Sequence, residues 1–526
     1  MLMNKAKPIL QFFCLFIAHA LLFFILAWCL PIRFEENDDV AMCMIANGTF
    51  TGVPNCHLVF QNALWGCLLV GLYTLTSGIE WYSILFALLS VSSASIIVWT
   101  VLKKTQQSKT TKVLFLLVVY LLWLRTVQSF QFTTIAALTC IAGVLMLICY
   151  RKHWIWIIGG GYIVCASLIR FNAAGLVGLM MVPLILWINK KKWKEYVRMA
   201  IVLAVVLLAK ASDKAFYLEE DWKYFSEYNV ARGQINDNPN TLSIDELNRI
   251  GVSGNDYALL RSFFPDPNIM TLPVVKSIRD ALANEPFSAK MKNVSQIVQY
   301  RIPLALVLLM AIMLFYDVDD HKERYFIVGL IVLLFAVAVG LCINNSFKNR
   351  VFLSMLLATV VSLAFFPLRG NKRWGVGILD FCLVMMMAKY SNQFYKHAQS
   401  TNGKIMVWND YQYPLLTSLP QNAFIANFGM ITEGMSPFDV HKFQYKLYPS
   451  GWDTNFPPLM EASDSHQCLL KADVFVFTGV DKDISLVEKG LLEHYDIVVE
   501  KHVVAENDKY AIIQIAEKNV SCFSNE

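Results

Sequence analysis

Charged residues are scarce in this chain. Only 16% of its 526 residues are Asp, Glu, Lys or Arg, whereas 56% are hydrophobic. The hydrophobic residues gather in runs of roughly 18 to 24, which are long enough to cross a hydrocarbon core of about 30 Å. Outer-membrane barrels are excluded, because their strands are short and alternate in hydropathy. The composition therefore predicts an all-α polytopic membrane protein.

Motifs for nucleotides and metals are missing as well. There is no P-loop, which argues against an ATP-driven pump, and neither a CxxC nor an HExxH pattern points to a metal. Most of the 12 cysteines lie inside hydrophobic runs, which argues against a disulfide framework. Two pairs in predicted outer segments stay open, Cys43 with Cys56 and Cys468 with Cys522. The basic residues lie in short loops, so nothing indicates nucleic-acid binding.

The distribution of Lys and Arg predicts the topology. Both residues gather in every second loop between hydrophobic runs, and such loops face the cytoplasm. Lys5 and Lys7 precede an uncleaved signal anchor, so we expect a cytoplasmic N-terminus in a plasma (inner) membrane. The basic loops are Lys103–Lys109, Arg151–His153, Asn189–Lys194, Asp317–Arg324 and Arg369–Arg373.

About eleven membrane spans fit this alternation, and an odd number places the C-terminus outside. The stretch His57–Leu75 is expected to lie as a helix along the outer interface, since a crossing there would move the Lys103 loop outside. The expected spans are Ile9–Leu30, Trp81–Leu102, Val113–Thr126, Phe132–Tyr150, Trp154–Leu168, Ala173–Ile188, Val197–Ala211, Val294–Phe315, Tyr325–Ile343, Val351–Phe366 and Val376–Tyr390.

Three segments are expected outside the membrane. The first outer loop covers residues 31–80, and a large outer loop, residues 212–292, is helical with a capping box at Ser243–Glu246. Residues 391–526 alternate strand-like and helical patterns, which indicates a small soluble, extracytoplasmic α/β domain after a membrane domain of residues 1–390. Its expected elements are strands at Lys404–Trp408, Ala423–Phe428, Asp473–Thr478, Ile497–Val503 and Tyr510–Ile515, and a helix at Ser485–His494.

An acidic cluster follows the first span. Glu35, Glu36, Asp38 and Asp39 stand at a membrane boundary, where basic anchoring residues are usual. Asp38 and Asp39 open a helix that Gly48 closes, so both can be caps favoured by the helix dipole. Glu35 and Glu36 exceed what capping requires, and carboxylates in this place can also act as a general base or hold a metal.

A longer pattern runs through the same outer loop. It comprises Glu36–Met42, Ile45–Gly48, Gly52–Pro54, His57 and Phe60–Asn62, followed by many spans. This order is similar to bacterial envelope members of the GT-C superfamily of membrane glycosyltransferases. The resemblance implies a GT-C-like fold with outer interfacial helices. It also implies transfer of a sugar from a polyprenyl-phosphate-linked donor to a glycan or lipid-linked acceptor.

The same resemblance assigns roles to the acidic loop. Asp38 or Asp39 would deprotonate the acceptor hydroxyl, which requires a carboxylate within hydrogen-bond reach, and we favour Asp38. The other acid would orient the acceptor or hold a divalent cation, Mg²⁺ or Mn²⁺. Glu36, His57 and Gln61 are candidates for contacting the sugar or acceptor, although His57 and Gln61 can equally form the wet face of their helix.

Cations at the outer face are candidates for binding the donor phosphate. Arg350 opens a predicted span, Arg170 lies in a very short predicted outer turn, and Lys210 is deep in an apolar run with Asp213 three residues on. Arg232 lies in the large outer loop and can reach over the site. Ionisable residues at membrane depth are functional by default, and Arg binds phosphate bidentately. The alternative is that these side chains snorkel to the interface and contact membrane lipids.

Two other functions remain open. A polysaccharide polymerase would use a diphosphate-linked oligosaccharide in place of a phosphate-linked sugar. A non-enzymatic lipid or glycan transporter should show paired broken helices in two matching halves, and the sequence has no such symmetry.

Overall fold

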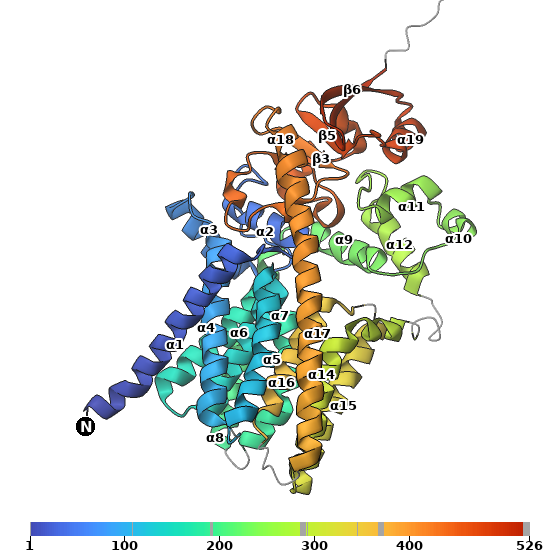
Figure 1. The fold of residues 1–526 in the computed structure, drawn as a ribbon. Helices are drawn as coiled ribbons and strands as arrows, with labels where there is room; N and C mark the ends of the chain where they lie inside the picture. Colours follow the sequence, from blue (N-terminus) through green and yellow to red (C-terminus); the bar gives the residue numbers. More distant parts are fainter. Residues whose placement is uncertain are drawn as a thin grey trace, which may run out of the picture.

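The structure of the protein is a computed structural model that describes residues 2–107, 109–189, 193–283, 291, 293–344, 346–366 and 373–518. Figure 1 shows a bundle of long helices with a small sheet domain above one end. Lys190, Lys191, Lys192 and Cys522, together with residues 369–372 of the last predicted basic loop, lie outside the described residues.

Seven of the described helices are long and apolar enough to cross a membrane. Their central member is α6, in which 94% of the most apolar 18-residue stretch is buried. α4 and α7 pack against it. The first helix, α1, stands to one side of the bundle with only 11% of its corresponding stretch buried (Figure 1). The seven candidate spans are Pro8–Cys29 in α1 (Leu2–Cys29), α4 (Trp81–Lys104), Thr111–Gln128 in α5 (Lys109–Gln128), α6 (Phe132–Cys149), α7 (His153–Ile188), Asn293–Asp317 in η1 and α14 (Asn293–Tyr300, Arg301–Asp317), and α15 (His321–Ile343).

The other predicted spans also fall on helices. Two of them lie together in α7, where Arg170 breaks the helix with a φ of −156° and a ψ of 97°. Three more fall on α8 (Trp193–Phe216), α16 (Asn349–Leu363) and α17 (Arg373–Met406). The chain is therefore a helical membrane protein, while a count of eleven crossings stays a prediction.

The first loop is anchored between α1 and the bundle. Its strand β1 (Arg33–Phe34) pairs in parallel with β2 (Ser129–Phe130), and α2 (Asn37–Asn47) follows at once. Gly48 ends α2 at a φ of 89°, in the left-handed region that favours glycine, as expected. The predicted helix over His57–Leu75 is only partly correct. α3 begins at Ala63, because the Asn62 side chain accepts a hydrogen bond from the Leu64 amide and caps it.

The large loop forms a helical layer above the bundle, beside the sheet domain (Figure 1). The capping box at Ser243–Glu246 is confirmed, since each side chain bonds the other's backbone. The helices of this layer are α9 (Glu220–Asn236), α10 (Ile244–Arg249), α11 (Gly254–Arg261) and α12 (Leu272–Ala283).

The C-terminal part contains a five-stranded mixed sheet in the order β4-β3-β5-β7-β6. β3 pairs in parallel with β4 and β5, while β7 is antiparallel to both β5 and β6. β6 and β7 form the expected terminal hairpin. The bounds are β3 (Phe424–Asn427), β4 (Lys446–Leu447), β5 (Val474–Gly479), β6 (Val499–Glu506), β7 (Tyr510–Glu517) and the helix α19 (Ser485–Tyr495).

One predicted strand, Lys404–Trp408, is wrong. These residues finish α17 and enter a π-helical turn, Val407–Gln412, because the helix that leaves the bundle continues without a break up to the sheet (Figure 1). The two-residue strand β4 was not expected, since it is too short to carry an alternating pattern. α17 also runs straight through the expected domain boundary at residue 390, and the division there stays a prediction.

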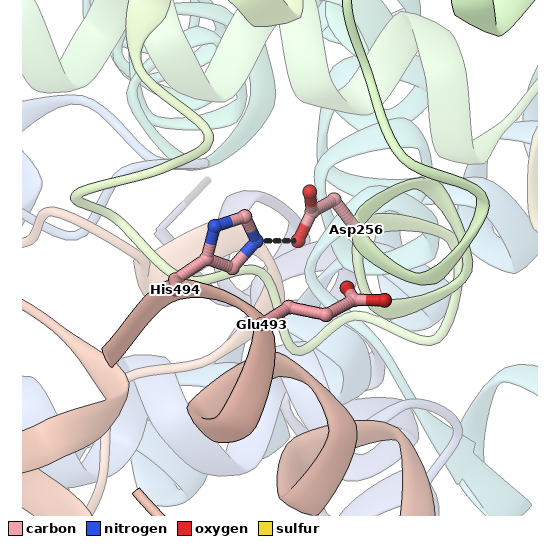
Figure 2. A group of neighbouring side chains, drawn as sticks. All are labelled: Asp256, Glu493 and His494. Atoms are coloured by element: carbon pink, nitrogen blue, oxygen red, sulfur yellow. Dashed lines mark hydrogen bonds and ion pairs between the residues drawn. The ribbon is translucent and has the colours of Figure 1, made fainter. Parts of the chain in front are cut away.

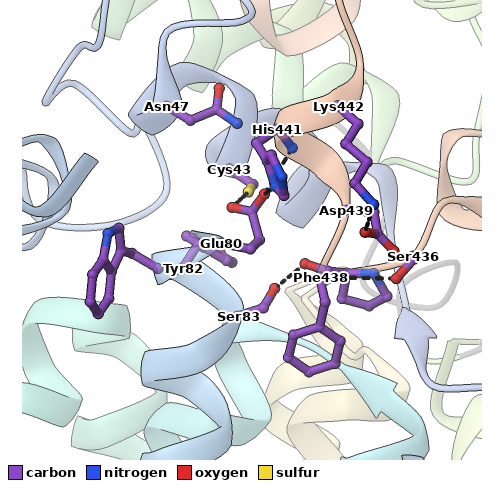
Figure 3. A network of polar contacts seen from close by, with 12 residues as sticks. Cys43, Asn47, Glu80, Tyr82, Ser83, Ser436, Phe438, Asp439, His441 and Lys442 are labelled. Carbon is purple, nitrogen blue, oxygen red and sulfur yellow. Dashed lines mark hydrogen bonds and ion pairs between the residues drawn. The ribbon is translucent and has the colours of Figure 1, made fainter. Parts of the chain in front are cut away.

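A buried polar network joins the first loop to the C-terminal part (Figure 3). The Glu80 carboxylate accepts hydrogen bonds from the Cys43 thiol at 2.8 Å, from the Tyr73 hydroxyl, and from the His441 amide at 2.8 Å. Ser83 donates to the Pro437 carbonyl beside it. Cys43 is thus a free thiol held by Glu80, so the suggested Cys43–Cys56 disulfide is not formed. The network fixes the loop that carries the acidic cluster.

Candidate active site

A cavity of about 1430 Å³ opens where α2, the break in α7, α8, α9 and the start of α16 meet. Charged, polar and apolar side chains all line it, and it brings together residues from distant parts of the sequence. Among the predicted site residues, its lining contains Asp38, Arg170, Lys210, Arg232 and Arg350. Phe60, Phe132 and Trp452 add aromatic surface.

Asp38 is the acid of the cluster that faces the cavity. It lies in the first turn of α2, where the helix dipole favours a negative charge. Burial raises the pKa of Asp38 and the neighbouring Glu36 carboxylate adds to this, whereas the guanidinium groups of Arg350, Arg170 and Arg232 lower it. The carboxyl therefore stands at the centre of a basic site with a pKa moved toward neutrality, as a general base requires.

Asp39 points the other way, into the protein. It is fully buried, and its Oδ1 accepts hydrogen bonds from the Tyr82 hydroxyl at 2.9 Å and the Phe132 amide at 3.0 Å, while Oδ2 has no protein partner. Burial raises the pKa of Asp39 well above its ordinary value, whereas the hydrogen bonds from Tyr82 and Phe132 lower it. Gln61 joins the same hydrogen-bond network, because its side-chain amide donates a hydrogen bond to the Tyr82 hydroxyl oxygen at 2.6 Å. Asp39 thus holds α2 against α6.

Two of the cavity's guanidinium groups have no ion-pair partner among the described residues. Arg170 donates to the Phe60 carbonyl at 2.8 Å and lies over the Phe132 ring at 5.2 Å. Arg232 is only 6% exposed and is held by the side-chain oxygens of Asn229 and Asn236 at 2.8 and 3.2 Å. A buried cation without a counter-ion is costly. Both groups are therefore suited to an anion that enters the cavity.

The other cations at this site are already paired. Arg350 forms an ion pair with Glu36 at 2.5 Å, and Lys210 forms one with Asp213 at 2.9 Å. Glu36 is absent from the cavity lining, so its role in this structure is to hold Arg350. Arg350 still lines the cavity and can turn to a ligand, but it would have to leave or share Glu36.

His57 and Gln61 are not brought into the cavity lining. The His57 ring stacks on Trp222 at 3.7 Å, and its Nε2 lies 3.0 Å from the Phe216 carbonyl. His57 therefore ties the first loop to α8 and α9. Neither residue lies on a helix, so the expected solvent-facing helix surface is not formed; His57 is half-buried and Gln61 is buried.

The C-terminal part supplies two residues that the sequence did not indicate. Trp452 lines the cavity, and the buried Asp453 beside it interacts through its charge with Arg232 and Asp38. Burial raises the pKa of Asp453 to about 7. No motif surrounds Gly451-Trp452-Asp453, and only the fold shows that this segment, more than 400 positions from Asp38, reaches the site.

A divalent cation does not fit Asp38 and Asp39. Asp39 is fully buried and its Oδ1 already accepts two hydrogen bonds, Asp38 is close to three guanidinium groups, and the described part of the chain gathers no trio of His, Cys, Asp or Glu ligands at the cavity. The one such trio in the described residues is Asp256, Glu493 and His494, with ligand atoms within 4.8 Å of one another (Figure 2). There His494 Nε2 lies 2.9 Å from Asp256 Oδ1, a contact that joins α11 to α19 outside the cavity lining.

Comparisons with known proteins are sparse. No family model and no curated protein sequence matches the chain. Two solved structures are similar to it: crystal structures of ArnT from Cupriavidus metallidurans, one bound to undecaprenyl phosphate and one in the apo state. Each similarity covers 96% of this chain and 98% of the ArnT chain at 12% identity, with TM-scores of 0.42 and 0.41. At these values the function has to be inferred from the site itself.

Proposed function

We propose that this protein is a membrane glycosyltransferase of the GT-C type. It transfers a sugar from a polyprenyl-phosphate-linked donor to a hydroxyl of an envelope glycan or lipid-linked acceptor at the outer face of the membrane. The observation that carries this proposal is one carboxylate, Asp38, in a large cavity beside two guanidinium groups that have no ion-pair partner in the part of the chain that the structure describes. A base next to an anion site suits attack by a hydroxyl on a sugar phosphate.

The reaction needs one proton acceptor and one site for a leaving group. Asp38 takes the proton of the acceptor hydroxyl as its oxygen attacks the anomeric carbon. The bond from that carbon to the phosphate oxygen breaks, and polyprenyl phosphate leaves with the electron pair. Arg170 and Arg232 bind the phosphate through charge-assisted hydrogen bonds and stabilise the charge that develops on it.

The position of the cavity suits a lipid-linked donor. Arg170 interrupts the apolar helix α7, so the phosphate would lie at the membrane boundary while its chain extends along the bundle. The cavity is also lined by Lys223 of α9 and Arg279 of α12, two helices of the large outer loop. That outer part has room for an acceptor. No divalent cation takes part in this scheme.

The test is release of polyprenyl phosphate from a radiolabelled donor by the purified protein in lipid nanodiscs, with envelope glycolipids as acceptors. Loss of a general base costs about 10²- to 10⁴-fold in rate, so Asp38→Asn should lower turnover by that factor. The same variant should fold normally, because Asn has the size of Asp and the loss of one first-turn charge from α2 costs only about 0.3–1 kcal/mol. Full turnover by Asp38→Asn would overturn the assignment.

A polymerase that uses a diphosphate-linked oligosaccharide is the second candidate. The cavity volume of about 1430 Å³ exceeds the 300–1,000 Å³ of typical small-ligand sites. Competition between phosphate-linked monosaccharides and diphosphate-linked oligosaccharides in the same assay separates the two. Preference for the diphosphate-linked donor would favour the polymerase.

A further inference from the structure

The C-terminal part takes a direct part in the cavity through a short turn, Ser450–Asn455. Within this turn Trp452 lines the cavity, whereas Asp453 is buried behind it. The charge of Asp453 acts on Arg232, and the charge of Asp38 acts on Asp453 in turn. The turn therefore lies beside both the base and the anion site.

The turn is held in one conformation. Asp453 Oδ1 accepts a hydrogen bond from the Ser450 amide at 2.6 Å, which closes a capping box around the 3-10 turn Gly451–Asp453. Gly451 has a φ of 62°, and a Cβ there would lie 3.3 Å from the Cβ of Phe263 after α11. Asn455 also adopts a positive φ, at 63°. A turn fixed in this way can present a ring in a constant place.

Trp452 is one of six aromatic residues that line the cavity, and it is the one that the C-terminal part supplies; the others are Phe60, Phe132, Tyr217, Phe225 and Phe263. Phe60 and Phe132 are engaged with the Arg170 guanidinium, which lies 5.6 and 5.2 Å from their ring centres. Trp452 packs against Phe60 at 5.3 Å with the planes at 61°, so it is supported at an edge and not covered by a stacked ring. It is partly exposed, toward the cavity that it lines.

We propose that Trp452 recognises the sugar of the donor. Its indole face stacks on the C–H face of the sugar ring while Arg170 and Arg232 hold the phosphate. The electron-rich face of an indole attracts positively polarised groups, and a pyranose presents such C–H groups on its less hydroxylated side. The C-terminal part then determines which sugar is accepted, while Arg170 of α7 and Arg232 of α9 determine that it is linked to a phosphate. This inference rests on the proposed function.

Binding measurements separate recognition of the sugar by Trp452 from binding of the phosphate. The probes are farnesyl phosphate and farnesyl-phosphate-linked glucose, titrated calorimetrically against the full chain in nanodiscs. Trp452→Ala should weaken the sugar-linked ligand by about tenfold and farnesyl phosphate by less than twofold. Trp452→Phe should recover most of the affinity. The matched control is Trp193→Ala, because Trp193 is 67% exposed and absent from the cavity lining.

Each other outcome is decisive. If Trp452→Ala binds the sugar-linked ligand as tightly as the wild type, or weakens both ligands equally, Trp452 does not recognise the sugar, although the phosphate site stands. If the wild type binds farnesyl phosphate but gains nothing from the attached sugar, the inference is likewise wrong. If the wild type binds neither ligand, the proposed donor class itself fails.

Discussion

The buried guanidinium of Arg232 allows a prediction in which stability and binding change in opposite directions. Arg232 is 6% exposed. Within the described residues its Nε has no hydrogen-bond partner, and the side-chain oxygens of Asn229 and Asn236 accept from its other nitrogens. An unpaired buried charge has an effective cost of several kcal/mol, part of which these hydrogen bonds offset. Arg232→Gln keeps a polar side chain of similar reach and removes the charge. In the absence of ligand we expect it to unfold at a higher temperature than the wild type, by a few degrees.

The same substitution should weaken binding of an anion. A hydrogen bond to a charged group contributes about 1.5–3 kcal/mol, which corresponds to a roughly 10- to 150-fold loss of affinity for farnesyl phosphate. Thermal unfolding in nanodiscs and calorimetric titration measure the two effects on one sample. Arg198→Gln is the matched control, since Arg198 pairs with Glu195 at 3.1 Å and does not line the cavity. Unchanged affinity would refute the anion site. A loss of affinity with a lowered unfolding temperature would show that Arg232 mainly supports the fold.

Four further predictions follow from the ion pairs, the buried acids and the charge pattern. Arg350→Ala should reduce turnover at scarce donor more than Arg350→Lys, because only Arg grips phosphate bidentately; equal wild-type rates in both would reduce Arg350 to an anchor. Glu80→Gln should lower the free energy of unfolding by about 3 kcal/mol, since it breaks a buried charged network; an unchanged unfolding temperature would contradict this. The pKa of Asp453 is raised to about 7 in the folded state. Between about pH 4 and pH 7 the folded protein therefore keeps this proton, whereas the unfolded protein loses it. The contribution of Asp453 to wild-type stability falls as the pH rises through this range. Asp453→Asn lacks this penalty, and its unfolding temperature relative to the wild type should rise from pH 4 to pH 7 and then level off; a flat difference would mean that Asp453 titrates normally. Finally, a cysteine at Lys109 should be labelled from the cytoplasm only, and labelling from outside would overturn the proposed orientation.

The helical part of the fold follows closely from hydropathy. Long apolar runs can satisfy their backbone groups in a membrane only as helices, so each predicted span falls on a helix. The terminal hairpin β6–β7 and the helix α19 were also predictable, because their patterns are local. The error at Lys404–Trp408 has a tertiary origin. These residues continue a helix that starts in the bundle. Trp408 packs closely against Gly434, since a Cβ added at Gly434 would lie only 2.5 Å from the Trp408 Cβ.

The site was predicted less completely, and the reason differs between residues. Asp38 could be found because four acids in five positions are unusual at a membrane boundary. Sequence could not distinguish it from Asp39, since the choice depends on which carboxyl faces the cavity and which bonds Tyr82 and Phe132. His57 was placed on a helix that starts only at Ala63. Its stacking on Trp222 depends on a segment 165 positions away, which no local pattern encodes.

The cations show what the structure adds to a list of candidates. All four predicted cations line one cavity, but their partners separate them into two kinds. Lys210 and Arg350 are neutralised by acids of the protein, so their charges are already used before any ligand arrives. Arg170 and Arg232 are held by neutral oxygens and aromatic rings, which fix their positions without cancelling their charge. A protein that keeps two guanidinium groups in this state around one carboxylate bears the cost in stability, and an anionic ligand that completes the site recovers it. Under the proposed function we therefore expect substitution of Arg170 or Arg232 to weaken donor binding more than substitution of Lys210 or Arg350.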